Sequence, residues 1–349
     1  MTPNVRRNRF LRLLPGIVLS AIAIIALILE VNWRQTLQAW AEAQLWVIAP
    51  AAALITGAML TRAIAWRCLM RNSVPLRKAF WNLNISYMLN SFLPFRLGDL
   101  ARAYLVSRRD IDDNSIAYGN SAGAEQPPVD VGTAFSAVAL ERVFDLILSA
   151  LLILLIFPMV SGKVGNDWIL ISSLGLAAAG FFTLLLLRVL SARIMQAAEG
   201  ISEKVPLIRP LLKPLEHFLK GLSLMRDLRY SLPGFLLIIV TMLLWAADYW
   251  VVMRGFVPSA PVAWGLLALV GGLIGVALPS SPAALGIFEI SLTVVLTAGG
   301  MARDVAVAYA ISLHMLNTLT NGLLGLLGLL AERRSLGSIL SVAQGSENP

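Results

Sequence analysis

Three charged residues lie close together at the head of an apolar stretch. Glu141, Arg142 and Asp145 precede most of the hydrophobic run 134–158. On an α-helix, residues three and four positions apart share one face, so Glu141 and Asp145 would lie one turn apart with Arg142 beside both. Charged side chains inside a membrane usually face the protein interior or a water-filled cavity. This spacing predicts a buried charge network in which both carboxylates hold the arginine; the alternative is a helix end whose charges reach the lipid headgroups.

A second polar group surrounds a proline in the run 79–106. Proline removes a backbone donor and disfavours helical geometry in the residue before it, so Pro94 predicts an interruption after Leu93. Irregular backbone at membrane depth occurs where it is buried in protein or lines water. The alternative is an amphipathic helix at the membrane surface. The candidate binding residues around this interruption are Asn90, Pro94, Arg96, Asp99 and Arg102.

A third group follows a Pro-Ser-Ser-Pro segment in the run 262–298. This segment predicts another break, with Ser280 or Ser281 capping the helix that follows and Pro282 in its first turn. Glu289 lies in the apolar stretch after the break and needs a partner, for which we expect an arginine of another cluster, in a binding site or in a structural ion pair. We assign to the candidate site the residues Pro279, Ser280 and Glu289.

The other polar residues of the apolar stretches fit helix packing better than chemistry. They are Asp248, His314, Asn317 and Asn321. With two histidines and one cysteine, the chain cannot assemble a zinc site of the His/Cys type, and it has no Gly-rich nucleotide-binding motif. We therefore expect no metal, no cofactor and no catalytic residue, and any net transport would depend on gradients.

These clusters lie in a chain with the composition of a membrane protein. Of its 349 residues, 58% are hydrophobic and 14% are charged, and the mean hydropathy is +0.76. Soluble proteins have about 45–50% apolar and about 25% charged residues. The composition disfavours a soluble enzyme, a DNA-binding domain and a secreted disulfide scaffold. It predicts an all-α, polytopic integral membrane protein.

Six apolar stretches are each near the about 20 residues that a membrane-spanning helix needs. They are 13–29, 45–66, 134–158, 168–188, 234–253 and 304–330. The two broken runs divide into pieces of about 10–17 residues, which are short for complete crossings and suit re-entrant segments or hairpins. Interrupted segments at corresponding places in two halves are typical of inverted-repeat transporters. We therefore expect residues 45–158 to mirror residues 234–330.

The basic residues predict the orientation. With the N-terminus inside, the cytoplasmic ends and loops carry 21 of the 28 lysines and arginines and the external loops carry four, while Arg62, Arg96 and Arg142 remain in the membrane zone. This asymmetry follows the positive-inside rule and explains the net charge of +8 without nucleic acid. We expect a protein of the inner (cytoplasmic) membrane with both termini in the cytoplasm. Its expected divisions are a basic N-terminus (1–12), a transmembrane domain (13–332) with a polar insertion (107–133) and an amphipathic cytoplasmic loop (189–231), and a disordered tail (333–349).

Taken in order, the three clusters resemble the motifs of a known family. Asn90 through Arg102, Glu141-Arg142-x-x-Asp145, and Leu278-Pro279 through Glu289 are similar to the motifs of the lysylphosphatidylglycerol synthase transmembrane region, a flippase-like family. The resemblance covers roughly residues 10–332. Two positions depart from the pattern: Asp99 stands where glutamate is common, and Ser-Ser-Pro-Ala-Ala-Leu-Gly replaces a Gly-Gly-Leu-Gly style. Bifunctional members carry a separate cytosolic synthase domain, which we do not expect here because 19 residues follow Leu330.

The resemblance implies that the chain moves a lipid or a lipid-linked headgroup between leaflets. Arg96, Arg102 and Arg142 would contact phosphate through their planar guanidinium groups. The acidic residues of the clusters would orient these arginines and contact a cationic headgroup. The alternatives are an intramembrane enzyme that modifies a lipid, and a non-transporting partner of a lipid- or envelope-synthesis complex. The expected partners are a membrane phospholipid or lipid-linked substrate, a second copy of the chain or a separate lipid-synthesis enzyme, and no nucleic acid.

Overall fold

The computed structural model describes residues 20–22, 24–25, 29, 31–92, 97–107, 129–160, 189–204, 212, 227–277 and 282–334. In this part of the chain the regular structure is helical and no strand occurs, which confirms the predicted all-α class. Several predicted segments lie outside the described residues, wholly or for the most part. They are the stretches 13–29 and 168–188, the insertion 107–133, the second half of the loop 189–231, and the tail 333–349.

Three of the described helices are long and apolar enough to cross a membrane. The first is Leu45–Leu69, made of the short 3-10 helix η1 (Leu45–Val47) and α3 (Ile48–Leu69); the others are α10 (Leu228–Phe256) and α13 (Arg303–Ala331). At 1.5 Å per residue, even the shortest reaches about 37 Å, which exceeds the about 30 Å of bilayer hydrocarbon. The prediction of a polytopic membrane protein is confirmed. A further long helix, α6 (Val131–Val160), covers the predicted stretch 134–158.

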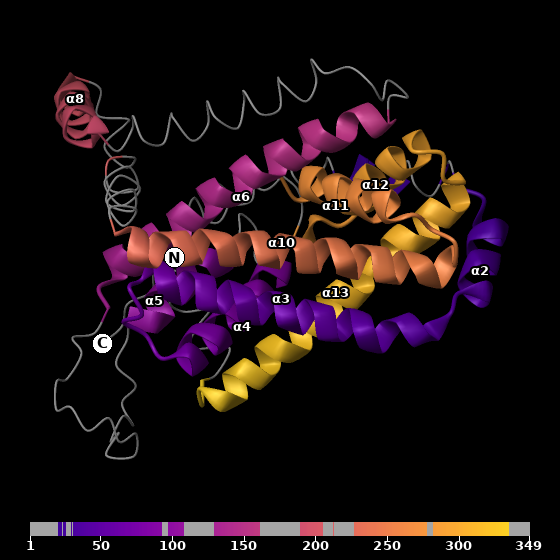
Figure 1. The fold of residues 1–349 in the computed structure, drawn as a ribbon, viewed down its shortest axis with the longest axis horizontal. Coiled ribbons are helices and arrows are strands. Elements are labelled where there is room, and N and C mark those ends of the chain that lie inside the picture. Colours follow the sequence, from indigo (N-terminus) through magenta and orange to yellow (C-terminus); the bar gives the residue numbers. More distant parts are fainter. Residues whose placement is uncertain are drawn as a thin grey trace, which may run out of the picture.

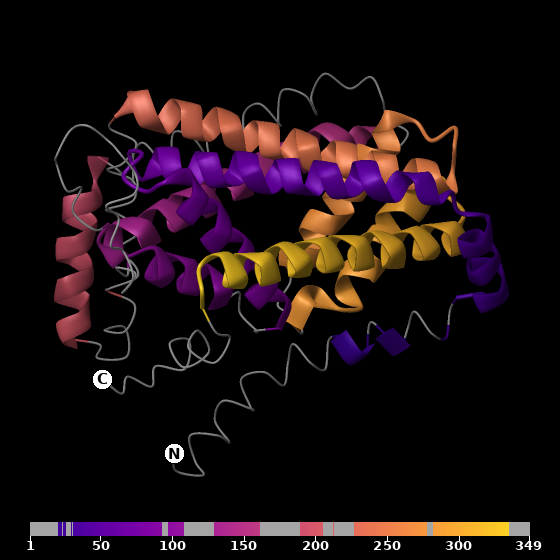
Figure 2. The same cartoon turned by 90° about the horizontal axis from the view of Figure 1, so that it is seen from below.

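The helices α3 and α10 lie side by side and run in opposite directions (Figure 1, Figure 2). At one end of the pair, the Gln44 N–H donates to the Gly255 carbonyl at 2.9 Å, and at the other end Gly234 faces Leu69. Between these ends, the hydroxyl oxygens of Thr61 and Thr241 are 2.8 Å apart. Such hydroxyl contacts satisfy polar groups inside the membrane. The pair defines two ends of the bundle, which we call the Leu69 end and the Phe256 end.

Both predicted interruptions separate two short helices. The first lies between α4 (Leu76–Phe92) and α5 (Leu97–Ser107). The second lies between α11 (Val262–Ala277) and α12 (Ile287–Ala298), with the 3-10 turn η4 (Pro282–Ala284) just before α12. The four helices have 17, 11, 16 and 12 residues, so each is shorter than the about 20 residues needed to cross the hydrocarbon. Each pair is therefore a hairpin of helices that are short for a complete crossing.

The two hairpins enter the bundle from opposite ends. The α4–α5 hairpin follows α3 and begins at the Leu69 end, whereas the α11–α12 hairpin follows α10 and begins at the Phe256 end (Figure 1). The turn η4, at the tip of the second hairpin, contacts α4 of the first. The two halves of the chain thus share one element order, a long helix, two short helices and a long helix, and their hairpins meet inside the bundle.

Two glycines allow the first hairpin to pack closely. A Cβ on Gly98 of α5 would overlap the Ser86 carbonyl oxygen of α4 and lie 2.6 Å from Asn90 Oδ1. A Cβ on Gly325 of α13 would overlap the side chain of Met88. Small residues at helix contacts let backbones approach in this way. As a result, α4 is held between α5 and α13.

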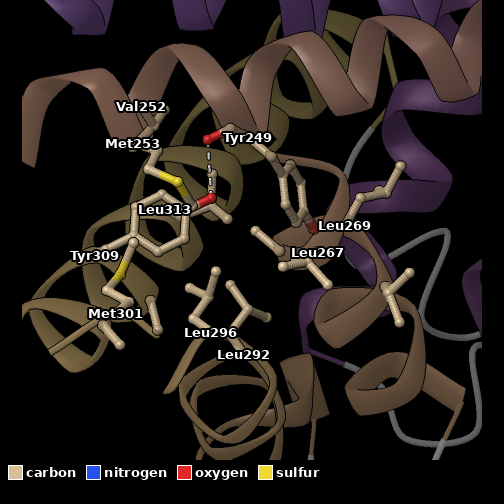
Figure 3. Close-up of a cluster of buried hydrophobic side chains, with 14 of the residues drawn as sticks. Tyr249, Val252, Met253, Leu267, Leu269, Leu292, Leu296, Met301, Tyr309 and Leu313 are labelled. Carbon is tan, nitrogen blue, oxygen red and sulfur yellow. Dashed lines mark hydrogen bonds between the residues drawn. The ribbon is translucent and has the colours of Figure 1, made fainter. Parts of the chain in front are cut away.

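An apolar core holds the second half together (Figure 3). Leu267 of α11, Leu292 and Leu296 of α12, Tyr249 of α10 and Tyr309 of α13 are all buried in it. The Tyr309 hydroxyl donates to the Tyr249 carbonyl oxygen at 2.9 Å. Because burying a polar group without a partner is costly, this bond lets the Tyr309 hydroxyl lie in the core.

Two amphipathic helices lie at the ends of the bundle. The helix α2 (Trp33–Glu42) was not among the predicted elements; it packs against α13, where the Trp40 indole N–H lies 2.9 Å from Ser312 Oγ and 3.1 Å from the Ala308 carbonyl oxygen. The other, α8 (Ser191–Lys204), forms part of the predicted amphipathic loop 189–231. Tryptophan is common where helices meet the membrane–water interface.

Candidate functional site

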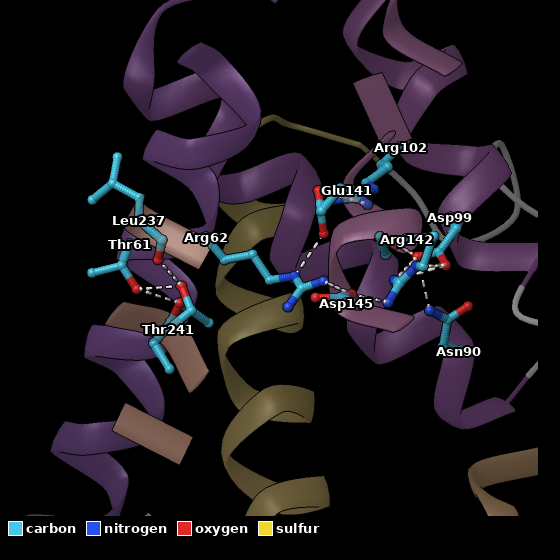
Figure 4. A network of polar contacts seen from close by, with 12 residues as sticks. Thr61, Arg62, Asn90, Asp99, Arg102, Glu141, Arg142, Asp145, Leu237 and Thr241 are labelled. Carbon is cyan, nitrogen blue, oxygen red and sulfur yellow. Dashed lines mark hydrogen bonds and ion pairs between the residues drawn. The ribbon is translucent and has the colours of Figure 1, made fainter. Parts of the chain in front are cut away.

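Six charged side chains from three helices form one connected network (Figure 4). We call it the charge network, and its members are Arg62 of α3, Asp99 and Arg102 of α5, and Glu141, Arg142 and Asp145 of α6. Three arginines face three carboxylates, so the network carries no formal net charge. This balance matters because a buried charge that loses its partner is strongly destabilising.

One end of the network is fully buried. Glu141, whose side chain is 0% exposed, accepts from Arg62 Nε at 2.6 Å through one carboxylate oxygen, and its other oxygen lies 3.1 Å from Arg102 Nη2. The Arg102 side chain is also 0% exposed, and its guanidinium lies 4.9 Å from the centre of the Trp66 ring, a cation–π contact. Glu141 therefore neutralises two buried arginines, Arg102 at 0% and Arg62 at 5% side-chain exposure.

The other end of the network is partly accessible. The Arg142 side chain is 26% exposed and binds Asp99 through two nitrogens, with Nη2 at 2.8 Å and Nε at 3.0 Å from Oδ2. Its third nitrogen, Nη1, donates to Asp145 at 3.1 Å, and Asp145 also pairs with Arg62. Asp145 thus joins the accessible end to the buried end.

The residues beside the first interruption position Asp99. Asn90, near the end of α4, accepts from the Gly98 N–H at 2.9 Å, and its amide nitrogen lies 3.3 Å from Asp99 Oδ1. The Ser86 hydroxyl lies 3.4 Å from the same oxygen. Asp99 is in the first turn of α5, where the positive end of the helix dipole favours a negative charge. Asn90 and Ser86 of α4 thus contact the start of α5 and hold Asp99 in place to bind Arg142.

The structure corrects the prediction for Arg142. Its carboxylate partners are Asp145 and Asp99, so the expectation that Glu141 and Asp145 hold it is wrong for Glu141. Consecutive residues of an α-helix point about 100° apart. Glu141 consequently turns toward Arg62 and Arg102, while Arg142 turns toward the start of α5.

Arg62 is a member of the charge network that the sequence analysis did not assign to the site. It lies on α3, 79 positions before Glu141 in the chain. The available signal was its position, since it is a lone charge inside the apolar stretch 45–66 and an arginine at membrane depth normally has a partner.

Some predicted site residues lie outside the described part of the chain. They are Pro94 and Arg96 of the first interruption and Pro279 and Ser280 of the second. Of the predicted residues that are described, the structure brings together Asn90, Asp99, Arg102, Glu141, Arg142 and Asp145, but Glu289 lies apart from them in the second half.

Glu289 pairs with a histidine rather than with an arginine. One of its carboxylate oxygens lies 2.6 Å from His314 Nδ1, and the other accepts from the Gly286 N–H at 2.7 Å. The expectation of an arginine partner is wrong, and so is the assignment of His314 to packing alone. The physical reason is proximity, because α12 packs on α13 and the Phe288 and His314 rings are 4.6 Å apart.

The helix after the second break begins later than predicted. Gly286, with φ of +80°, is the N-cap of α12, and the Glu289 side chain accepts from its N–H. The expected cap at Ser280 or Ser281 is wrong, because Pro282 opens η4 and Ala283 and Ala284 both have φ of 58°. This left-handed backbone delays the first helical turn.

A second polar contact joins α13, the helix of His314, to α10. The Asn317 amide nitrogen of α13 lies 3.3 Å from Asp248 Oδ2 of α10, and Asp248 is 0% exposed. Asn317 follows His314 by three positions, so the two lie on one face of α13. We call Asp248, Glu289, His314 and Asn317 the second polar site. Among the described residues, no group of three or more His, Cys, Asp or Glu side chains could hold a metal ion.

The fold and the charge network define the class of protein: a polytopic α-helical membrane protein with two interrupted hairpins and balanced charges buried between its helices. The sequence model of the family described as "Lysylphosphatidylglycerol synthase TM region" matches residues 13–325. The chain belongs to this family, and the predicted resemblance is confirmed. Comparisons with curated proteins and with solved structures gave no significant match.

Proposed function

We propose that this protein moves a lipid, or a lipid-linked headgroup, between the two leaflets of the cytoplasmic membrane. The observation that carries the proposal is the charge network, which extends from fully buried Glu141 to Arg142 at 26% exposure beside an interrupted hairpin. Charged residues at this depth are costly and typically mark a pathway for a polar substrate. The family description, which names a membrane region associated with a lipid, agrees with this proposal.

The charge balance favours a headgroup that carries both a phosphate and a cationic group. Each described arginine of the network is already paired with a carboxylate, and a phosphate that takes the two-nitrogen contact of Arg142 would displace Asp99. The displaced carboxylate would then need a positive partner. An ammonium group on the same headgroup supplies one, and neither buried charge is left unpaired. Arginine suits this exchange because its fork binds carboxylate and phosphate in the same geometry.

The two hairpins supply the access. They begin at opposite ends of the bundle, and the tip of the second contacts the first. In this proposal the halves form an inverted repeat, and the headgroup passes between the hairpins from one side of the membrane to the other. The basic residues support a cytoplasmic location for both termini. A separate lipid-synthesis enzyme, or a second copy of the chain, is the proposed partner.

Leaflet exchange in vesicles tests the proposal. The purified protein would be reconstituted in phosphatidylcholine vesicles with a trace of fluorescent phosphatidylglycerol or of its lysylated form, and inner-leaflet lipid would be measured by its protection from an impermeant quencher. We expect loss of protection with the wild type and slower loss with Arg142→Ala. The matched control is Arg34→Ala, at an exposed arginine of α2. If inner-leaflet lipid stays protected in vesicles that hold the wild-type protein, the proposal is overturned. A new lipid species on chromatography would overturn it in favour of an intramembrane enzyme.

A further inference from the structure

The second half of the chain repeats the register of the charge network. Arg142 is the twelfth residue of α6 and His314 the twelfth residue of α13; Asp145 and Asn317 are both fifteenth. The partners repeat as well. Arg142 pairs with the third residue of α5, Asp99, and His314 pairs with the third residue of α12, which is Glu289.

The remaining contact joins corresponding helices but not corresponding positions. Asp145 contacts Arg62 of the long helix α3, and Asn317 contacts Asp248 of the long helix α10. Arg62 is the fifteenth residue of α3, whereas Asp248 is the twenty-first residue of α10. Three matched positions on two pairs of corresponding helices, with a polar contact to the preceding long helix in both halves, indicate a site rather than scattered packing residues.

The chemistry of the two sites differs in one respect. The charge network holds its carboxylates with arginines, which stay protonated in proteins. Among the described residues, the basic group paired with Glu289 is the imidazole of His314, and the hydrogen-bond donor to Asp248 is the neutral Asn317 amide. Asp248 is 0% exposed, and its Oδ1 has no hydrogen-bond donor; the buried Oδ1 of Asn317 also has none. The second polar site thus has buried acceptor oxygens and two carboxyl groups beside one imidazole.

The His314–Glu289 contact requires a proton between the two side chains. Two acceptor atoms do not approach to 2.6 Å; with Glu289 ionised, the proton is on Nδ1, which donates it to the carboxylate. In the neutral ring, the other nitrogen, Nε2, then bears a lone pair. It is the atom that can take up a further proton, and histidine is the side chain whose ordinary titration falls in the physiological range.

We propose that the second polar site is a proton-binding site: Nε2 of His314 takes up one proton, and the resulting imidazolium lies against Glu289. His314 shares one face of α13 with Asn317, which contacts Asp248 of α10. The bond formed is Nε2–H, and the proton comes from the water phase. Its use in driving lipid movement rests on the proposed function. The titratable or charged groups on His314's own helix and on the helices packed against it are Arg303, Asp304 and Tyr309 of α13, Glu289 of α12, Arg229, Tyr230, Asp248, Tyr249 and Arg254 of α10, Arg62, Arg67 and Cys68 of α3, Arg77, Lys78 and Tyr87 of α4, and Arg34 and Glu42 of α2.

Histidine NMR tests the site without any lipid. The chain has two histidines, so His217→Gln leaves His314 as the single labelled imidazole in the purified full-length protein. We expect Nδ1 to stay protonated and Nε2 to gain a proton as the pH falls through about 8 to 5. A ring that keeps one protonation state over this range would overturn the proposal. So would a signal that moves with sodium at constant pH but not with pH, which would indicate a metal-cation site.

Two variants separate proton binding from a structural role. In Glu289→Gln, the side chain has a single oxygen, which we expect to accept from the Gly286 N–H as one Glu289 oxygen does. The amide nitrogen then takes the place of the oxygen that faces His314. We expect the resting proton to move from Nδ1 to Nε2 and the titration midpoint to fall by about one pH unit or more, because a neighbouring negative charge is lost. Asp248→Asn should lower the midpoint as well, while the matched control Asp304→Asn, at the exposed start of α13, should leave it unchanged. Equal midpoints in all four proteins would overturn the proposal.

Leaflet exchange in vesicles then tests whether proton binding is coupled to lipid movement. With a pH difference across the membrane, leaflet exchange by the wild type should change with the direction of the gradient, and Glu289→Gln should abolish that dependence while Asp304→Asn keeps it. If the rate of leaflet exchange by the wild type does not depend on the pH gradient, the proposed coupling is overturned. If the wild type moves no lipid at all, the proposed function fails, and the NMR titration still decides whether the proton site exists.

Discussion

Glu141→Gln should be among the most destabilising single changes in the charge network. The substitution keeps the shape of the side chain but removes the negative charge that faces two arginines, at 2.6 Å and 3.1 Å. Glu141 and Arg102 are both 0% exposed, so water cannot replace the lost partner. Breaking a buried ion pair in this way costs about 3–5 kcal/mol. We expect a loss of that size in the free energy of unfolding, measured by denaturant titration in mixed micelles.

Asp145→Asn is the matched comparison. Asp145 also contacts two arginines, but its side chain is 16% exposed, and each arginine keeps a second carboxylate, Glu141 for Arg62 and Asp99 for Arg142. The expected loss is about 1.5–3 kcal/mol, the range for a hydrogen bond to a charged group. Equal losses for the two variants would refute the reasoning from burial.

A double variant tests the charge balance itself. Adding Arg102→Met to Glu141→Gln removes one positive and one negative charge, so the network is neutral again. Replacing both members of a buried pair by uncharged groups is far less costly than removing one. The double variant should therefore be more stable than Glu141→Gln alone. A loss equal to the sum of the two single losses would show that the residues act independently.

Three further predictions concern the rest of the structure. Arg142→Lys should keep the charge but slow leaflet exchange, because lysine cannot bind Asp99 through two nitrogens; exchange at the wild-type rate would contradict this. Gly98→Ala should lower thermal stability, since its Cβ would overlap a carbonyl oxygen of α4, and an unchanged melting curve would show that α5 can shift. With Cys68 replaced by serine, Ser107→Cys should react with an impermeant thiol reagent from the cytoplasm and Ala302→Cys from outside; labelling from one side would rule out hairpins that open to opposite faces.

The apolar helices and their interruptions were predictable because each depends on local sequence. Hydropathy identifies the long helices at Leu45–Leu69 and Arg303–Ala331 to within three residues and α10 to within six, since a membrane-spanning helix must be apolar along its whole length. Proline alters the backbone within two residues, so the ends of α4 at Phe92 and of α11 at Ala277, just before Pro94 and Pro279 in the sequence, could be predicted from the sequence. The exact start of α12 could not, because it depends on the left-handed backbone at Ala283 and Ala284.

The pairing of the charged residues was only partly predictable. Which residues form the site follows from the cost of burying charge, and that rule pointed to Glu141, Arg142 and Asp99. Which residue meets which depends on how distant helices pack. Arg62 and Glu141 are 79 positions apart, and His314 reaches Glu289 only because α13 lies against α12. No local pattern contains that information.

The short hairpins have a consequence for how the protein is made. A helix too short to cross the hydrocarbon is a poor independent span for the insertion machinery, and any interruption between helices carries backbone groups that hydrocarbon cannot satisfy. The long helices α3, α10 and α13 meet no such obstacle. We therefore expect the hairpins to reach their final positions late, after the long helices have packed around them. Because the second hairpin contacts α4, biogenesis of the first half ends only when the C-terminal half has been synthesised and has docked.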